Sequence, residues 1–158
     1  MKKTALSVCL ALLLACGRED GASDAVILFA EALADSDYAA AWQLLSPKSQ
    51  ALYDSTVVIL HHFGYTEAGG AAGRLAGQMT EQEFASLTGE QLFSRMVSTA
   101  PETRSLSTSI RSVEYRDSTL AVVLVRTADG PQEIPVRRTA GAWRIDLTGL
   151  EPPPEEGD

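Results

Sequence analysis

The hydrophobic pattern in the first half of the chain has the helical period. The first predicted helix begins just before Val26, and either Ser23 or Asp24 can cap it. Ser46 followed by Pro47 is typical of a helix start and predicts a longer helix that stops at Gly64. Apolar positions recur three or four residues apart in two earlier stretches, which are Val26, Phe29, Ala30 and Leu33, then Tyr38, Ala41, Trp42 and Leu45.

The stretch that follows, residues 64–79, lacks this pattern because glycine and alanine dominate its first part. It predicts a loop, and the sequence leaves open whether the loop is an ordered lid or a mobile segment. Thr80 with Glu83, and Thr88 with Gln91, then match the capping-box pattern, in which a Glu or Gln lies three residues after the cap. Two short helices are therefore expected, the second ending at Pro101.

Alternation of apolar and polar residues replaces the helical period in the second half of the chain, which predicts β-strands. A change of parity near Arg111 and Ser112 predicts a β-bulge in the first strand. Helices followed by an antiparallel meander indicate an α+β fold, with N-terminal helices packed on a curved antiparallel sheet. The four expected strands cover residues 104–115, 119–127, 132–138 and 143–147.

The two ends of the chain differ in composition from the part between them. Residues 1–15 join Lys2 and Lys3 to a short apolar run, which is typical of a secretory signal peptide, because a membrane span needs about 20 apolar residues. The small and polar residues 16–23 predict a tether. Residues 24–150 then form one domain, and the acidic, proline-rich residues 151–158 form a disordered tail.

The apolar run ends in Leu13-Leu14-Ala15-Cys16, which resembles the lipobox of bacterial lipoproteins. The resemblance implies that the chain is cut before Cys16 and that a diacylglyceryl group and further acyl chains, such as palmitate, anchor Cys16 in a membrane. Gly17 follows, which by the sorting rule of enteric bacteria favours the outer membrane over the inner one. The protein would face the periplasm or the exterior of the cell envelope. The alternative is a plain cleaved signal peptide.

Charge bears on the partners of the chain. Its net charge of -8 comes from 13 basic and 21 acidic residues, and removal of Lys2 and Lys3 with the signal would make it -10. Lys48 would be the only lysine left. So acidic a chain has no electrostatic attraction to nucleic acid, and lipid rather than charge would hold it at a membrane. Cys9 would leave with the signal, so no disulfide is expected.

Residues 24–46 and 103–148 resemble NTF2-like (cystatin-like) domains. The first segment carries Asp37-Tyr38-Ala39-Ala40 and ends in Leu44-Leu45-Ser46, and the second carries Gly141-Ala142-Trp143-Arg144-Ile145. The resemblance implies a sheet that wraps helices into a cone with a pocket at its mouth. That fold serves ketosteroid isomerases and related cyclases as well as binding modules, so it does not choose a function. Residues 47–102 match no pattern of the family.

Candidate chemistry is sparse. Adjacent helical residues such as His61 and His62 point about 100° apart, so they cannot easily share a metal ion, and no metal site or cofactor is predicted. An isomerase needs a carboxylate in an apolar pocket. Glu114 and Asp146 have the polar parity of their strands, so we expect them to face solvent and we predict no catalytic residue.

The expected function is that of a lipid-anchored, non-catalytic cell-envelope protein whose domain binds a partner protein or a small apolar ligand. One alternative is a ketosteroid-isomerase-like or cyclase-like enzyme that uses a pocket carboxylate. Another is a structural accessory domain of an envelope assembly. Candidates for lining a pocket, with core packing as the competing interpretation, are Tyr38, Trp42, Phe63 and Trp143.

Overall fold

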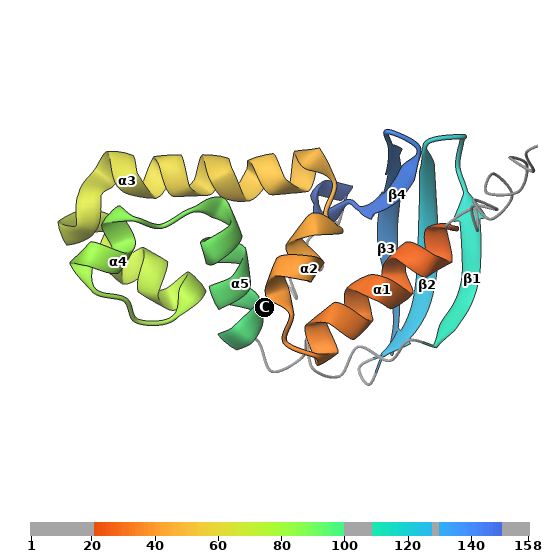
Figure 1. The fold of residues 1–158 in the computed structure, drawn as a ribbon, viewed down its shortest axis with the longest axis horizontal. Coiled ribbons are helices and arrows are strands. Elements are labelled where there is room, and N and C mark those ends of the chain that lie inside the picture. The colour runs from red at the N-terminus through yellow and green to blue at the C-terminus, as the bar shows by residue number, and fades with distance from the viewer. Residues whose placement is uncertain (1–20, 100–108, 128–129, 150–158) are drawn as a thin grey trace, which may run out of the picture.

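The computed structural model of the chain describes residues 21–99, 109–127 and 130–149 (Figure 1). Within these residues the helices come first and an antiparallel sheet follows, so the predicted α+β fold is confirmed. The helices are α1 (Ala22–Ala34), α2 (Tyr38–Gln43), α3 (Pro47–Ala76), α4 (Glu81–Ala85) and α5 (Gly89–Thr99). The strands are β1 (Ile110–Tyr115), β2 (Leu120–Thr127), β3 (Gly130–Thr139) and β4 (Ala142–Ile145), followed by the 3₁₀ turn η2 (Leu147–Gly149).

Helix starts follow the local sequence signals closely, with one exception. The Ser46 hydroxyl accepts a hydrogen bond from the Ser49 amide at 3.1 Å, as an N-cap does. Both capping boxes form, since Thr80 exchanges hydrogen bonds with Glu83 and Thr88 exchanges them with Gln91. In α1 the cap is Gly21, two residues before the expected Ser23, and the Asp24 carboxylate accepts from the Gly21 amide.

Helix α3 continues beyond Gly64, which corrects the expected loop over residues 64–79. Gly64 interrupts the helix with φ 74° and ψ 167°, a conformation suited to glycine, and the helix then resumes as far as Ala76. Three alanines spaced four residues apart, Ala68, Ala72 and Ala76, are buried along this second part. The segment packs through small side chains, so its helical stripe does not stand out as hydrophobic in the sequence.

The sheet is a meander with the order β1-β2-β3-β4, and it is not closed into a barrel. A register shift between Ile110 and Ser112 confirms the predicted bulge. Ala140 and Gly141 both have positive φ, as a tight hairpin between β3 and β4 requires. Parts of other predictions lie outside the described residues. These are the signal peptide with Cys16 and most of the tether, residues 104–108 of the first strand, Pro101, and the tail.

Helix α1 lies across one face of the sheet and contacts every strand (Figure 1). The buried apolar side chains form two clusters that meet along α5, where Leu92 belongs to one and Phe93 to the other. We call the first the sheet core: Ala22, Ala25, Val26, Phe29, Leu33, Ala41, Trp42, Leu45, Phe93, Ala121, Val123, Val125, Val136, Trp143 and Ile145. We call the second the helical core: Val57, Leu60, Ala68, Ala72, Ala76, Met79, Phe84, Leu87 and Leu92.

Candidate functional site

Three of the four predicted pocket residues lie together. Trp42 on α2 and Trp143 on β4 are buried in the sheet core, and Tyr38, at the start of α2, packs against it half-buried. Phe63 lies apart from them, on the outer side of α3, with 55% of its surface exposed. The structure therefore divides the predicted set into a group inside the sheet core and one side chain on the surface.

Trp42 belongs to a compact group of aromatic rings that the pocket prediction did not include. Its ring centroid lies 5.9 Å from that of Tyr53 and 5.7 Å from that of Phe93, and the Tyr53 and Phe93 centroids are 5.4 Å apart. Burial raises the pKa of the Tyr53 phenol above its usual value, so the hydroxyl stays protonated at neutral pH. The three rings pack against one another, and Phe93 and Trp42 are buried, so the group forms part of the core.

Trp143 makes a second aromatic contact that reports the curvature of the sheet. Its ring lies edge-on to that of Tyr115, with centroids 5.7 Å apart, although Tyr115 is on β1 and Trp143 on β4. In a flat sheet these outer strands would be about 14 Å apart, given roughly 4.8 Å per strand. The two rings meet because the face that carries them is concave. Tyr115 is largely exposed, so Trp143 is covered on this side by a ring that faces solvent.

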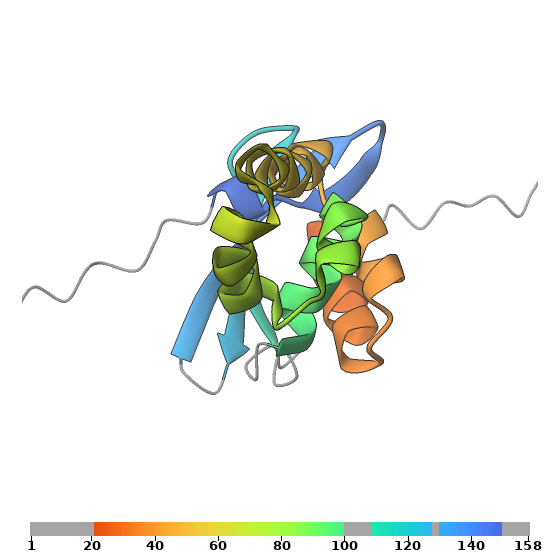
Figure 2. The same ribbon diagram turned by 90° about the vertical axis from the view of Figure 1, so that its left-hand side faces the viewer.

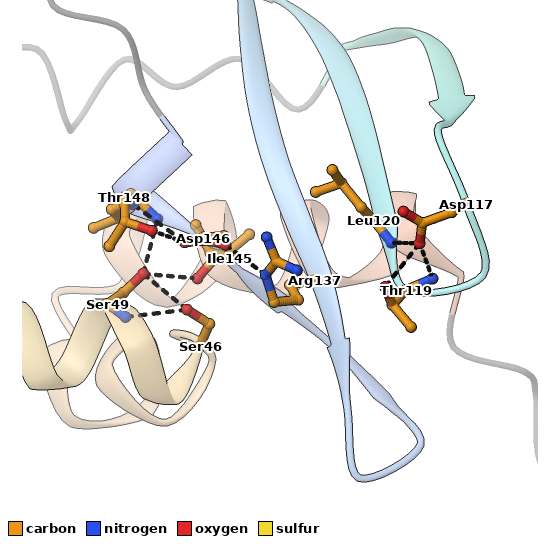
Figure 3. Close-up of polar contacts among 10 residues, drawn as sticks. Ser46, Ser49, Asp117, Thr119, Leu120, Arg137, Ile145, Asp146 and Thr148 are labelled. Atoms are coloured by element: carbon orange, nitrogen blue, oxygen red, sulfur yellow. Dashed lines mark hydrogen bonds and ion pairs between the residues drawn. The ribbon is translucent and has the colours of Figure 1, made fainter.

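Asp146 is buried, which corrects the expectation that it faces solvent. It does share the outer sheet face with Arg137, as its parity predicted, but β4 ends at Ile145 and η2 then covers the carboxylate. Arg137 Nε donates to Asp146 Oδ2 at 2.8 Å, and the Thr148 hydroxyl and amide donate to Oδ1 (Figure 3). Strand parity predicts exposure only within a strand, and Asp146 lies one residue after the end of β4.

These bonds set the charge state of Asp146. Burial by itself raises the pKa of the carboxyl, but the hydrogen bonds from Thr148 and Arg137 outweigh it and hold the pKa below its usual value. Asp146 is thus an ionised group with its acceptors in use. A general acid or base of the isomerase type has the opposite property, a carboxyl pKa raised by an apolar site.

Next to Asp146, two buried serines join the start of α3 to the end of the sheet. Ser49 Oγ accepts from the Leu147 amide at 2.8 Å and donates to the Ile145 carbonyl at 3.4 Å (Figure 3). The Ser46 amide donates to the same carbonyl at 2.7 Å. Every buried side-chain nitrogen and oxygen in the described part of the chain has a partner. These hydrogen bonds therefore have a structural role: they form a polar joint between the start of α3 and the end of the sheet.

The remaining polar candidates lie apart from one another. His61 Nε2 is 2.7 Å from the Phe84 carbonyl oxygen, whereas the ring of His62 lies against that of Phe63. Glu114 is exposed, as predicted, and pairs with Arg116 at 3.0 Å. Within residues 21–99, 109–127 and 130–149, no three His, Cys, Asp or Glu side chains gather in a way that could hold a metal ion.

Two further observations bear on the class of protein. None of the helices in the described ranges has the length and hydropathy needed to cross a membrane. Comparison of the chain with protein-family models, with curated proteins and with solved structures gives no match.

Proposed function

We propose that the chain is a lipid-anchored, non-catalytic protein of the bacterial cell envelope, whose helix–sheet domain binds a partner protein or a small apolar ligand. The observation that carries the anchor is the sequence Leu13-Leu14-Ala15-Cys16 at the end of an apolar run that begins just after Lys2 and Lys3. Outer-membrane attachment is the preferred location, because Gly17 rather than Asp follows the cysteine. The NTF2-like resemblance belongs to the same proposal, and an α+β fold with a curved sheet is consistent with it.

The anchor is tested by metabolic labelling of the full chain with radioactive palmitate in bacterial cells. The parent chain should take up label, and Cys16→Ser should not. Cys9→Ser is the matched control, because the proposed cleavage removes Cys9 with the signal, so this variant should label like the parent. Label retained in Cys16→Ser, or lost in Cys9→Ser, contradicts the proposal.

The binding part of the proposal is supported by the aromatic side chains of the concave sheet face. Tyr115 exposes an aromatic ring that covers Trp143, so an apolar molecule there would contact the Tyr115 ring. Tyr115→Ser should weaken the binding of an apolar fluorescent dye such as anilinonaphthalene sulfonate. Leu28→Ser, which removes a comparably exposed apolar side chain from α1, is the control and should bind like the parent. Equal binding by both variants argues against this site.

A further inference from the structure

The first part of α3 exposes a stripe of large apolar side chains to solvent. Leu52, Ile59 and Phe63 are 49%, 57% and 55% exposed. They are spaced by seven and four residues, so they share one side of the helix. Val58, which lies about 100° around the helix from Ile59, is more exposed still. Val57 and Leu60 enter the helical core from the flank of the helix that adjoins the stripe, so apolar surface continues from the core to solvent.

The outer side of this helix also lacks acidic residues, in a chain that has 21 of them. Between residues 47 and 63 the only acid is Asp54. Its side chain is turned towards α5. A Cβ added to Gly89, at the start of α5, would clash with the Asp54 carboxylate and would lie 2.8 Å from the Asp54 amide nitrogen. Lys48 lies one turn before Leu52 on the stripe side. We call the surface of Lys48, Leu52, Ile59 and Phe63 the α3 outer face.

The first part of α3 lies at a boundary of the fold. In Figures 1 and 2 it runs along the same edge as the β1–β2 and β3–β4 turns. Near the end of β3, Arg138 Nε donates to the carbonyl of Gly141 in the β3–β4 turn. In the β1–β2 turn, the carboxylate of Asp117 is bonded to Thr119 and Leu120.

We propose that the α3 outer face rests on the surface of a lipid bilayer, with Leu52, Ile59 and Phe63 in the interfacial layer and Lys48 at the level of the lipid phosphates. Helices that lie in the bilayer interface bury a side that carries Trp, Phe or Leu and place Lys or Arg at the headgroups. The proposal rests on the proposed anchor in one respect. Six residue-to-residue steps separate Cys16 from Ala22 and span at most about 22 Å, so an anchored domain is held against the membrane.

A second copy of the chain fits this face less well. Stable interfaces bury about 800 Å² on each partner, whereas a fully buried aromatic side chain contributes about 150–250 Å². Three half-exposed side chains on a single helix do not reach that area. The cation at the head of the stripe and the missing acids favour a surface that carries phosphate groups.

The test uses a chain that starts at Cys16, with that thiol coupled chemically to maleimide lipids in vesicles. Every buried residue of both cores lies at or after Ala22, so this chain keeps them. Phe63→Trp places a tryptophan on the stripe, and Leu28→Trp places one at a similarly exposed position on α1. The native Trp42 and Trp143 are buried, so the added residue dominates any quenching by brominated lipid.

We expect brominated lipid to quench and blue-shift the emission added by Phe63→Trp and to leave that of Leu28→Trp unchanged. Ile59→Trp should behave like Phe63→Trp. Equal quenching of the α1 and α3 probes, or quenching of none, overturns the proposal. So does self-association of the uncoupled chain that Phe63→Ser abolishes. Because the coupling is chemical, the result does not depend on whether cells attach lipid to Cys16, which palmitate labelling decides separately.

Discussion

The sheet core and the helical core use different side chains to bury apolar surface. In the sheet core, Trp42, Phe93 and Trp143 join aliphatic side chains, most of them from α1 and the strands. The helical core is smaller, with Phe84 as its largest member, and three of its nine residues are alanines of α3, against four alanines among fifteen residues in the sheet core. Because hydrophobic stabilisation scales with buried apolar area, at roughly 25 cal/mol per Å², we expect the sheet core to contribute more to stability. The helical core depends more on the close approach of backbones.

The largest effect is expected where the two cores adjoin on α5. Phe93 is 1% exposed and contacts the rings of Phe29, Trp42 and Tyr53, so Phe93→Ala should cost about 3–5 kcal/mol in the free energy of unfolding. Leu92→Ala removes a fully buried side chain from the helical core and should cost about 2–5 kcal/mol. Urea titrations followed by far-UV circular dichroism measure both.

The same pair of variants shows whether the cores unfold together. Phe93→Ala should reduce the near-UV signal of the aromatic group, whereas Leu92→Ala should leave it largely intact. If the cores form one cooperative unit, the tryptophan emission and far-UV transitions coincide in both variants. If the two transitions separate in Leu92→Ala, the helical core unfolds by itself, and the two cores are independent folding units.

The next effect on stability concerns backbone strain in α3, as distinct from side-chain packing. Gly64→Ala puts a side chain at φ 74°, where no neighbouring atom lies within 4 Å, so its cost of about 1–3 kcal/mol is backbone strain alone. Gly70→Ala, in the same helix and equally uncrowded, should stabilise the protein by about 0.5–1 kcal/mol. Thermal melting of both variants gives the two signs. Destabilisation of the same size in both would mean that the break at Gly64 is not required.

An effect similar in size to that of Gly64→Ala, but dependent on pH, is expected at the hydrogen bonds between α3 and the end of the sheet. The folded protein holds the pKa of Asp146 below its unfolded value of about 3.9, so this stabilisation is present above that pH and is lost as pH falls through the folded pKa. Asp146→Asn should cost about 1–3 kcal/mol at neutral pH and flatten the decline in stability on acidification. Urea midpoints measured between pH 7 and about pH 3 test this.

Thr148→Val is the companion variant, because it keeps the carboxylate and removes the hydroxyl that donates to it at 2.6 Å. The pKa of Asp146 should then rise, and stability should begin to fall at a higher pH than in the parent. A pH profile unchanged in both variants would mean that Asp146 does not contribute to the acid sensitivity of the fold.

The sheet region could be predicted from sequence in some detail, because its signals are local. Alternation marked the strands, the parity change at Arg111 and Ser112 marked the bulge, and Gly141 marked a turn. Side-chain caps such as Ser46 and Thr80 also lie where the sequence placed them. Each of these depends on a few neighbouring residues.

The wrong predictions concern features that depend on tertiary contacts. The helix over residues 65–76 is rich in glycine and alanine, which form no strong hydrophobic stripe, and its burial depends on α4 and α5. Asp146 is covered by η2, which strand parity cannot foresee. In the candidate site, Trp42 and Trp143 were singled out from sequence, but Tyr53 as a member of the aromatic group was not. Its place follows from how α2, α3 and α5 pack.

The most direct test of the account is an intact-mass measurement of the full chain expressed in bacteria and extracted from their membranes with detergent. If Cys16 carries the proposed anchor, we expect a single mature species that begins at Cys16. It should be heavier than its polypeptide by a diacylglyceryl group, with or without a further acyl chain. A mature chain recovered in the soluble fraction, or one whose N-terminal residue lies elsewhere and whose mass equals that of the bare polypeptide, would contradict it.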